Sequence, residues 1–379
     1  MAVEYVPGLA GVPAARSRVC KIDGQAGLLS YRGYDVGQLA EHSTFEEVAY
    51  LLLKGQLPTR AELDGFIGEL RNHRRLKFRI IELLKTLPED GHPMEALVAT
   101  LSAIGMFYPH SIMDTPEQRW GATIRIMTKT PTVVAAYHRI RNGDEPVVPR
   151  DDLSHAANFL YMLNGKEPDP LVAKMMDVAF ILHAEHGMNA STFAARVTGS
   201  TLADPYAVIS AAIATLAGPL HGGANEDVLA MLRSIPDGVK GVRAFAEQQV
   251  ANKGKVAGFG HRVYKVKDPR ATILQGLVGQ VFARFGSTPL YDVAVELEKV
   301  MAELVGSKGV YPNVDFYSGI VYEKLGIPSD LFTPIFAIAR TAGWLAHWLE
   351  QLEQNRIYRP AQIYEGQLGL TYVPIQKRG

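Results

Sequence analysis

The amino-acid sequence predicts an all-α protein with one minor β-hairpin near its N-terminus. The chain has 379 residues, of which 47% are hydrophobic, which is enough for a large buried core and for two domains. Most of the segments between Gly, Pro and Asn-Gly carry apolar residues at helical spacing, and strand-like alternation is scarce. These observations together favour a mainly helical fold.

The hairpin is expected in VCKIDGQAGLLSYRGYD, residues 19–35, where Asp23-Gly24 can form the turn. Two helix starts follow, because Ser43 with Glu46 and Thr59 with Glu62 fit the capping box, in which each side chain accepts from the other residue's free backbone N–H. Gly55 is placed to end the first of these helices.

The remaining helices are predicted from apolar spacing between Gly and Pro breaks. They are expected at residues 93–107, 131–143, 151–165, 171–187, 225–235, 271–286, 290–306 and 331–352. A further helix, ending at Ala217, is indicated by Asp204-Pro205, which fits N-cap and first helical position.

The stretch GPLHGGAN, residues 218–225, connects two of these helices. Gly218 stands where a glycine commonly follows a helix, and Asn225 can cap the next helix. His221 is therefore predicted to lie in a tight corner just before a helix N-terminus.

Overall charge and cysteine content limit the possible partners. Lys+Arg and Asp+Glu are equal at 39 each, so nothing favours nucleic acid or an anionic membrane as a partner. Cys20 is the only cysteine, which fits a reducing compartment. The first residues lack the layout of a signal peptide, and no apolar run reaches membrane-spanning length. We expect a cytoplasmic protein that binds no nucleic acid or membrane.

Standard nucleotide and hydrolase motifs are absent. Gly258-x-Gly260 has no third glycine at the dinucleotide-fold spacing, and neither Gly165-Lys166 nor Gly254-Lys255 has the spacing of a P-loop. The serine elbow G-x-S-x-G is also missing.

The stretch HAEHG offers His183, Glu185 and His186 as possible metal ligands. The zincin pattern needs histidines at i and i+4 with a glutamate at i+1, whereas these histidines are three residues apart. A packed or capping role is the alternative for His183. For His186 a ligand contact and a structural hydrogen bond both remain open.

Several motifs together resemble the citrate synthase family. These are HAEHG, GPLHGGAN, GFGHRVYKVKDPR, YPNVDFYSG and FAIAR, in that order, and the resemblance runs from IDGQAGLLSYRGYD to RIYRPAQIYEG. It implies an all-α homodimer with a large domain, residues 1–222 and 329–379, and a small domain, residues 223–328. Substrate would bind in the cleft between the domains.

The family condenses oxaloacetate with acetyl-CoA, in the tricarboxylic acid cycle, and hydrolyses citryl-CoA to citrate and CoA. By resemblance Asp315 is the base that takes a methyl proton, His221 donates a hydrogen bond to the enol or enolate oxygen, and His261 polarises the ketone. The positive end of a helix dipole would keep His221 neutral. From the residues alone, Asp315 could instead cap the following helix.

Oxaloacetate carries two carboxylates, which suit the planar fork of arginine. The resemblance implies that Arg270, Arg340 and Arg359 bind them, with His186 as a neutral partner and Arg359 reaching the site of the other subunit. Arg340 lies in an otherwise apolar helical run, so its charge needs a partner there, and a structural salt bridge is the alternative.

CoA is expected along KGKVAGFGHRVYK, with Gly258, Phe259 and Gly260 beside the adenine and Lys265 at phosphate oxygens, although Lys265 can equally be an ordinary surface lysine. No metal and no cofactor are expected, because the CoA thioester is a substrate.

Two other functions remain open at this point. One is 2-methylcitrate synthase, a close relative that uses propionyl-CoA, since one methylene in an apolar pocket contributes only ~1–3 kcal/mol to discrimination. The other is a catalytically inactive helical scaffold. Assembly beyond a dimer is also open, and inhibition by NADH is not expected.

Overall fold

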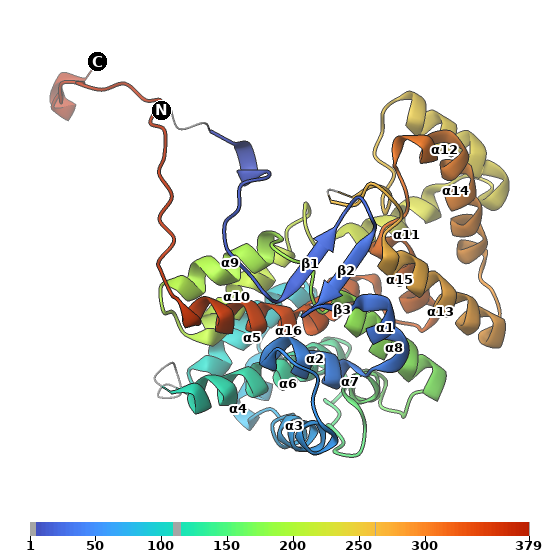
Figure 1. Cartoon of the computed structure of the whole chain (residues 1–379), viewed down its shortest axis with the longest axis horizontal. Helices are drawn as coiled ribbons and strands as arrows, with labels where there is room; N and C mark the ends of the chain where they lie inside the picture. The colour runs from blue at the N-terminus through green and yellow to red at the C-terminus, as the bar shows by residue number, and fades with distance from the viewer. Residues whose placement is uncertain (1–4, 109–114, 262, 379) are drawn as a thin grey trace.

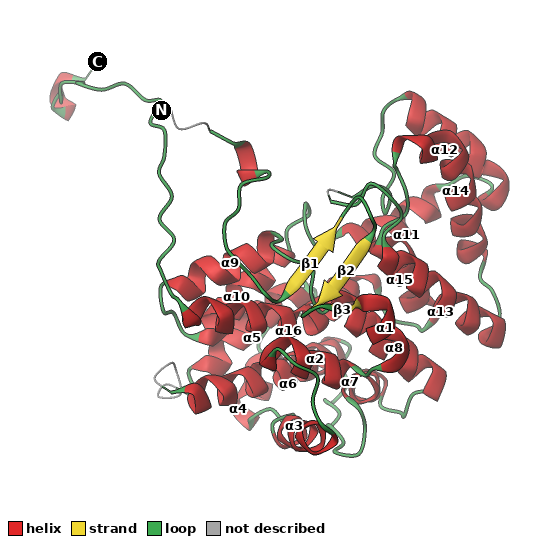
Figure 2. Cartoon of the chain, viewed as in Figure 1, coloured by secondary structure: helices red, strands yellow, loops and turns green. Residues whose placement is uncertain are grey.

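The computed structural model describes residues 5–108, 115–261 and 263–378. Within these ranges it contains 16 α-helices and one three-stranded sheet (Figure 1, Figure 2). The all-α class with a minor N-terminal hairpin is therefore confirmed. In the described part of the chain, no helix combines the length and the apolar content needed to cross a membrane.

The strands are β1 (Cys20–Asp23), β2 (Leu28–Tyr31) and β3 (Tyr34–Asp35), and they pair antiparallel in that order. The predicted hairpin is confirmed, but its connection spans residues 24–27 rather than the dipeptide Asp23-Gly24. Asp23 Oδ1 accepts from the backbone N–H groups of Gln25 and Ala26, at 3.0 and 2.9 Å, and this Asx-type turn stabilises the longer loop.

The helices are named in chain order. The first ten are α1 (Val36–His42), α2 (Phe45–Lys54), α3 (Arg60–Asn72), α4 (Phe78–Lys85), α5 (Pro93–Gly105), α6 (Pro116–Arg141), α7 (His155–Asn164), α8 (Pro170–His183), α9 (Ala190–Ser200) and α10 (Pro205–Leu216). The last six are α11 (Ala224–Ser234), α12 (Val242–Ala251), α13 (Pro269–Phe285), α14 (Pro289–Val305), α15 (Val314–Lys324) and α16 (Phe332–Glu353).

Several local predictions are confirmed. Asp204 caps α10 with Pro205 at its first position, and Thr59 with Glu62 forms the expected capping box of α3. Gly55 ends α2 in the left-handed conformation, with φ of 88°. Helices α1, α4, α9 and α12 were not among the predicted segments.

The capping box predicted for Ser43 and Glu46 is wrong. Thr44 is the N-cap of α2, and its side chain accepts from Glu47 N–H, because Ser43 is occupied in ending α1. The carboxylate of Glu46 is buried and accepts from the backbone N–H of His155, at the start of α7, at 2.6 Å. A neighbouring helix therefore uses the group that the local pattern assigned to α2.

The helix expected to begin at Pro131 begins at Pro116 instead. Thr115 and Gln118 form its capping box, and α6 continues through Pro131 to Arg141. Proline removes one backbone hydrogen bond from a helix interior, but α6 packs against α3, α4, α5, α7 and α16, and this burial outweighs the local penalty.

Helix α16 forms the centre of the larger body. It contacts α2, α5, α6, α8, α9 and α10, and Trp344 and Trp348 on it are fully buried. Helices α11 to α15 lie together at one side of the molecule (Figure 1). They contact the rest through α11 with α16 and through α13 with α1 and α8. The domain boundaries at 222/223 and 328/329 remain a prediction.

Candidate active site

Three stretches far apart in the sequence meet where the α11–α15 group joins the larger body. They are the turn after α8 with His186, the segment around His261 and the N-terminus of α15. The rings of His186 and His261 are 5.3 Å apart, centroid to centroid, and His186 Nε2 lies 3.2 Å from the Tyr264 hydroxyl. Burial, followed by the charges of Arg270 and Arg340, lowers the pKa of His186 well below its usual value. His186 is therefore neutral at physiological pH.

The proton position on His261 follows from its backbone contacts. The N–H groups of Val263 and Tyr264 donate to Nδ1, at 3.0 and 3.1 Å. Nδ1 must therefore be unprotonated, and Nε2 carries the proton of the neutral ring. Burial and the charge of Arg270 lower the pKa of His261 to about 4. The ring can thus donate one hydrogen bond from Nε2 while remaining uncharged.

His221 has the opposite tautomer. The backbone N–H of Ser191, in the first turn of α9, donates to His221 Nε2 at 3.3 Å, and the Ser191 hydroxyl lies 2.8 Å from the same nitrogen. Nε2 is then the acceptor, so Nδ1–H is free to donate. Burial and the charge of Arg340 lower the pKa of His221 to about 4. Both effects keep the ring neutral.

The corner that carries His221 differs in detail from the prediction. Helix α11 begins at Ala224, so its N-cap is Gly223, and the N-cap predicted at Asn225 is wrong because the helix has already begun. A Cβ at Gly222 would lie 2.3 Å from the carbonyl oxygen of Leu216, so only glycine fits there. Gly222 therefore packs closely against the C-terminal end of α10.

Asp315 lies in the first turn of α15, and Asn313 is the N-cap of that helix. The alternative in which Asp315 only caps the helix is thereby wrong. Among the described residues, no hydrogen-bond donor contacts its carboxylate oxygens. Burial raises the pKa of Asp315 to about 6, although the charge of Arg270 opposes the shift. Above that pH the carboxylate is ionised and has free lone pairs.

The segment predicted to bind CoA is tied to the start of α15. Gly260 N–H donates to Tyr311 O, and Gly258 O accepts from Asn313 N–H, both at 2.8 Å. The rings of Phe259 and Phe316 pack edge to face at 4.9 Å. These contacts place Asp315 beside the chain that leads to His261. They also occupy backbone groups that the sequence analysis assigned to the adenine. Lys265 is exposed at the end of the same segment.

Arg270 is buried at the start of α13 and forms an ion pair with Asp268. Its Nε and Nη2 donate to the two carboxylate oxygens of Asp268, at 3.1 and 2.7 Å. Burial opposes the charge of Arg270, but Asp268 raises the pKa of the guanidinium above its usual value. Arg270 is thus held as a cation beside His261, and its charge also acts on His186 and Asp315.

Arg340 is 1% exposed in the middle of α16. Its Nε donates to the carbonyl oxygen of His183 at 2.7 Å, and its guanidinium lies 4.7 Å from the centre of the Phe336 ring. In the described ranges it forms no ion pair, which contradicts the salt-bridge alternative. The charge of Glu185 acts on Arg340, but no carboxylate of the described residues lies within ion-pair distance, and this arrangement favours an anionic ligand.

The three possible metal ligands of HAEHG point to different partners. His183 Nδ1 lies 2.8 Å from the carbonyl oxygen of Ala179, and its ring packs against Phe336, which confirms the packed interpretation. Glu185 lies 2.9 Å from His347, and His186 contacts Tyr264. Across the described residues, no three His, Cys, Asp or Glu side chains converge as a metal site would require.

Several residues that support the site cannot be identified from sequence motifs. Glu185 is fully buried, and its Oε1 accepts from Gly187 N–H at 2.6 Å and lies 2.9 Å from His347 Nε2. Arg196 donates to Nδ1 of His347, so Nε2–H of that ring donates to Glu185. These contacts hold the turn that carries His186. The polar residues Asn189, Ser191 and Thr192 follow His186 in the sequence, but the sequence does not show the partners of their side chains.

Arg359 is not brought together with the other predicted site residues. It is exposed beyond the end of α16, where the C-terminal segment leaves the body (Figure 1). There it lines a groove of about 1070 Å³ with residues of the N-terminal segment, α9, α16 and the chain after α16, among them Arg16, Arg18, Phe193 and Tyr358.

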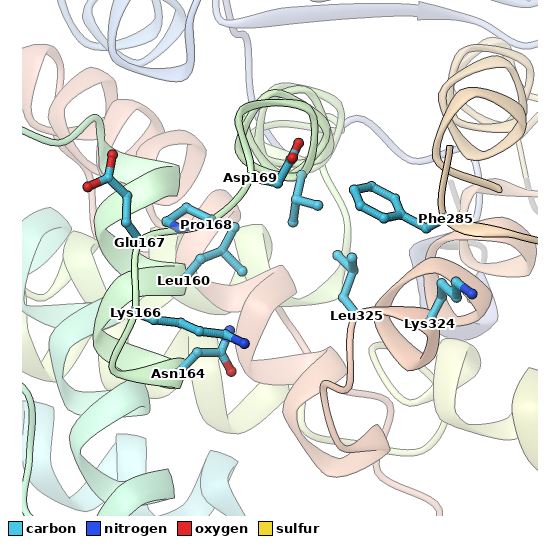
Figure 3. A pocket seen from close by; sticks show the side chains of 10 residues that line it. Leu160, Asn164, Lys166, Glu167, Pro168, Asp169, Phe285, Lys324 and Leu325 are labelled. Carbon is cyan, nitrogen blue, oxygen red and sulfur yellow. The ribbon is translucent and has the colours of Figure 1, made fainter. Parts of the chain in front are cut away.

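A second cavity, of about 380 Å³, lies between the α7–α8 connection and the C-terminal ends of α13 and α15 (Figure 3). Leu160, Lys166, Phe285 and Lys324 are among the residues that line it. None of the predicted site residues does so. The cavity is therefore separate from the histidine site.

The sequence of this chain is similar to the sequences of known citrate synthases. The family model described as "Citrate synthase, C-terminal domain" matches residues 8–361. A citrate synthase from Synechocystis sp. is 60% identical over 374 residues, which cover 99% of this chain and 94% of the relative. A citrate synthase from Acidithiobacillus ferridurans is 51% identical, and the match covers 99% of this chain and 99% of the relative.

Solved structures agree with these relatives. The crystal structure of citrate synthase from Pyrobaculum aerophilum is 41% identical, with a TM-score of 0.92, over 98% of this chain and 95% of that one. The ternary complex of citrate synthase from Thermoplasma acidophilum with carboxymethyl coenzyme A and oxaloacetate is 33% identical, with a TM-score of 0.92. It covers 99% of this chain and 100% of that one.

Proposed function

The chain belongs to the citrate synthase family, and from that premise we propose how its own side chains condense acetyl-CoA with oxaloacetate. The chain is an acyltransferase that forms citryl-CoA and hydrolyses it to citrate and CoA. None of the relatives described above is named as a methylcitrate synthase. The observation that carries the proposed mechanism is one carboxylate without a hydrogen-bond donor among the described residues, together with two neutral imidazoles of opposite tautomer. The charges of the buried Arg270 and Arg340 act on this group of side chains.

The first step is removal of a proton from the methyl carbon of acetyl-CoA. Asp315 takes the proton, and the electron pair of the C–H bond moves onto the thioester oxygen. His221 donates its Nδ1–H to that oxygen and stabilises the enol or enolate. Ser191 supports this role, because its contact with Nε2 leaves Nδ1 as the donor. A ring with a pKa of about 4 donates without carrying a full charge.

The second step forms the carbon–carbon bond. The methylene carbon attacks the ketone carbon of oxaloacetate, and negative charge develops on the ketone oxygen. His261 donates Nε2–H to that oxygen. Arg270, Arg340 and the neutral His186 hold the two carboxylates, since both arginines are buried and their charges act on the site histidines. Water then cleaves the thioester of citryl-CoA, which releases citrate and CoA.

In this mechanism no resident metal or cofactor takes part, because the CoA thioester is itself a substrate. Lys265 is available for phosphate oxygens of CoA, as it is exposed beside the segment that carries Phe259. The backbone groups that pair residues 258–260 with residues 311–313 are already hydrogen-bonded to each other. Other groups must therefore form the hydrogen bonds to the adenine.

The catalytic assignment is tested by release of free thiol from acyl-CoA. We expect release from acetyl-CoA only when oxaloacetate is present, and much slower release from propionyl-CoA under the same conditions. Faster turnover of propionyl-CoA would instead assign the methylcitrate reaction to this chain. The absence of release with either thioester would leave an inactive scaffold.

We propose in addition that the chain acts as a homodimer in which Arg359 reaches the site of the partner subunit. Two features support this. Arg359 is exposed within its own chain, and the C-terminal segment beyond it exposes apolar side chains that a partner surface would cover, among them Ile363, Leu368, Leu370 and Tyr372.

Co-expression of two inactive variants tests the shared site. In a heterodimer of Arg359→Ala with Asp315→Asn, one site keeps both its own Asp315 and the partner's intact arginine. We therefore expect thiol release from the mixed dimer, purified by two different tags, although each homodimer is nearly inactive. An inactive mixed dimer would show that Arg359 acts within its own chain, and a fully active Arg359→Ala homodimer would show that it has no role in catalysis.

A further inference from the structure

The tip of the β1–β2 hairpin lies against the chain that follows His261 (Figure 1). The carbonyl oxygen of Gly24, at the tip, accepts from the backbone N–H of Lys265 at 2.9 Å. The hairpin belongs to the N-terminal part of the chain, whereas His261 belongs to the α11–α15 group. This contact therefore joins the two parts of the molecule beside the candidate site.

The approach at Gly24 is too close for any side chain. A Cβ there would lie 2.2 Å from the carbonyl oxygen of Val263 and 2.8 Å from its carbonyl carbon. Both are backbone atoms, which cannot rotate away as the end of a flexible side chain can. Gly24 does not have a positive φ, so its requirement for glycine comes from this contact and not from its own conformation.

The contacted carbonyl belongs to the peptide group that orients His261. Val263 C=O and Tyr264 N–H lie in one planar peptide unit, so displacing the oxygen also turns the N–H. That N–H donates to His261 Nδ1 at 3.1 Å, next to the N–H of Val263 at 3.0 Å. The Val263–Tyr264 peptide group thus contacts Gly24 on one side and the imidazole of His261 on the other.

The hairpin is itself anchored on the other wall of the site. The Tyr31 hydroxyl donates to the carbonyl oxygen of Glu185, 2.9 Å away, and Ile22 packs closely over Gly187. At the tip, Asp23 Oδ1 holds the N–H groups of Gln25 and Ala26. The hairpin therefore contacts both the turn with His186 and the segment with His261.

We propose that Gly24 is a positioning residue for the condensation, which keeps the Val263–Tyr264 peptide in place so that Nε2–H of His261 is aimed at the ketone oxygen of oxaloacetate. This inference rests on the proposed role of His261. A group that stabilises developing charge must be held in its productive orientation before the reaction, and a misplacement of about 1 Å can lower the rate by about 100-fold.

The test uses Gly24→Ala, with Gln25→Ala as the matched control. Gln25 is the next residue on the same turn, its side chain is exposed, and only its backbone N–H is used. The measurements are kcat, KM for acetyl-CoA, and the ¹³C chemical shift of enzyme-bound [2-¹³C]oxaloacetate, which reports polarisation of the ketone. Melting temperature is measured on every variant.

For Gly24→Ala we expect kcat to fall on the order of 10- to 100-fold. The downfield shift of the bound ketone carbon should shrink, while KM for acetyl-CoA changes little. Gln25→Ala should match the wild type in all three. A loss of thermal stability alone would not alter the carbon shift of the folded, oxaloacetate-bound enzyme, so the shift separates positioning from a purely structural role.

A second variant avoids the steric clash altogether. Replacing residues 24–27 with Asn-Gly keeps Asp23 paired with Leu28 through a two-residue turn, and it removes the contact with Val263. We expect the same smaller shift and lower kcat. If this variant folds and retains the wild-type kcat and carbon shift, the proposal is overturned, whatever Gly24→Ala does. If wild-type enzyme is active but leaves the bound ketone unpolarised, the role of His261 fails and the proposal falls with it.

Discussion

Replacing Asp315 with asparagine should lower the rate of condensation by roughly 10²–10⁴-fold, the usual contribution of a general base. Asparagine keeps the shape of the side chain but removes its basicity. Asn313 caps α15, so the helix does not depend on the carboxylate, and no donor among the described residues contacts it. Folding and oxaloacetate affinity should therefore change little.

Three measurements on the same Asp315→Asn protein check this expectation: melting temperature, oxaloacetate binding and thiol release from acetyl-CoA. Asp292→Asn is a suitable control, because Asp292 is an exposed carboxylate in the first turn of α14 and lies outside the site. A variant that condenses at nearly the wild-type rate would remove Asp315 from the mechanism.

The same residue sets a pH dependence. Burial raises the pKa of Asp315 to about 6, and only the ionised form can accept a proton. Turnover should therefore be near its maximum above this pH and fall roughly tenfold for each pH unit below it. The histidines, with pKa values of about 4, stay neutral through most of that range. The residual activity of Asp315→Asn should lack this acidic limb.

Replacing His221 with alanine should lower kcat by roughly 10²–10³-fold, as the loss of one donor to a developing oxyanion does. The alanine removes Nδ1–H, which the contact of Ser191 with Nε2 leaves free for the thioester oxygen. Oxaloacetate binding and polarisation of its ketone should persist, because His261 and the arginines are unchanged.

The contrast with His261→Ala makes this second prediction specific. His261→Ala should abolish the downfield shift of bound [2-¹³C]oxaloacetate, whereas His221→Ala should preserve it while thiol release is slow. If His221→Ala also abolished the shift, the two histidines would act on one oxygen, and their assignment to separate substrates would be wrong. Unchanged thiol release would exclude His221 from catalysis.

Local sequence signals were reliable where one short segment decides the outcome. The capping box of Thr59 and Glu62, the Asp204-Pro205 helix start and the glycine that ends α2 all depend on hydrogen bonds within a few residues. The order of the histidine and aspartate motifs was likewise enough to identify the family. The caps and the helix end form through local hydrogen bonds, with little contribution from the rest of the chain, and the local sequence therefore predicts them.

Local signals failed where a distant group competed. Glu46 accepts from His155 rather than from its own helix, and Pro131 lies inside α6 because other helices bury that segment. In both cases the energy of tertiary packing exceeds a local preference of about 1 to 3 kcal/mol. A sequence pattern within a dozen residues carries no information about that packing.

The sequence by itself determined the helical class, the hairpin and the identity of the side chains able to perform the chemistry. Only the tertiary structure decided which nitrogen of each histidine carries the proton, since this depends on Ser191 for His221 and on the Val263–Tyr264 peptide for His261. It also decided that Gly24 must be a glycine. Proton position and steric room are properties of groups in contact, and those contacts join residues from separate parts of the chain.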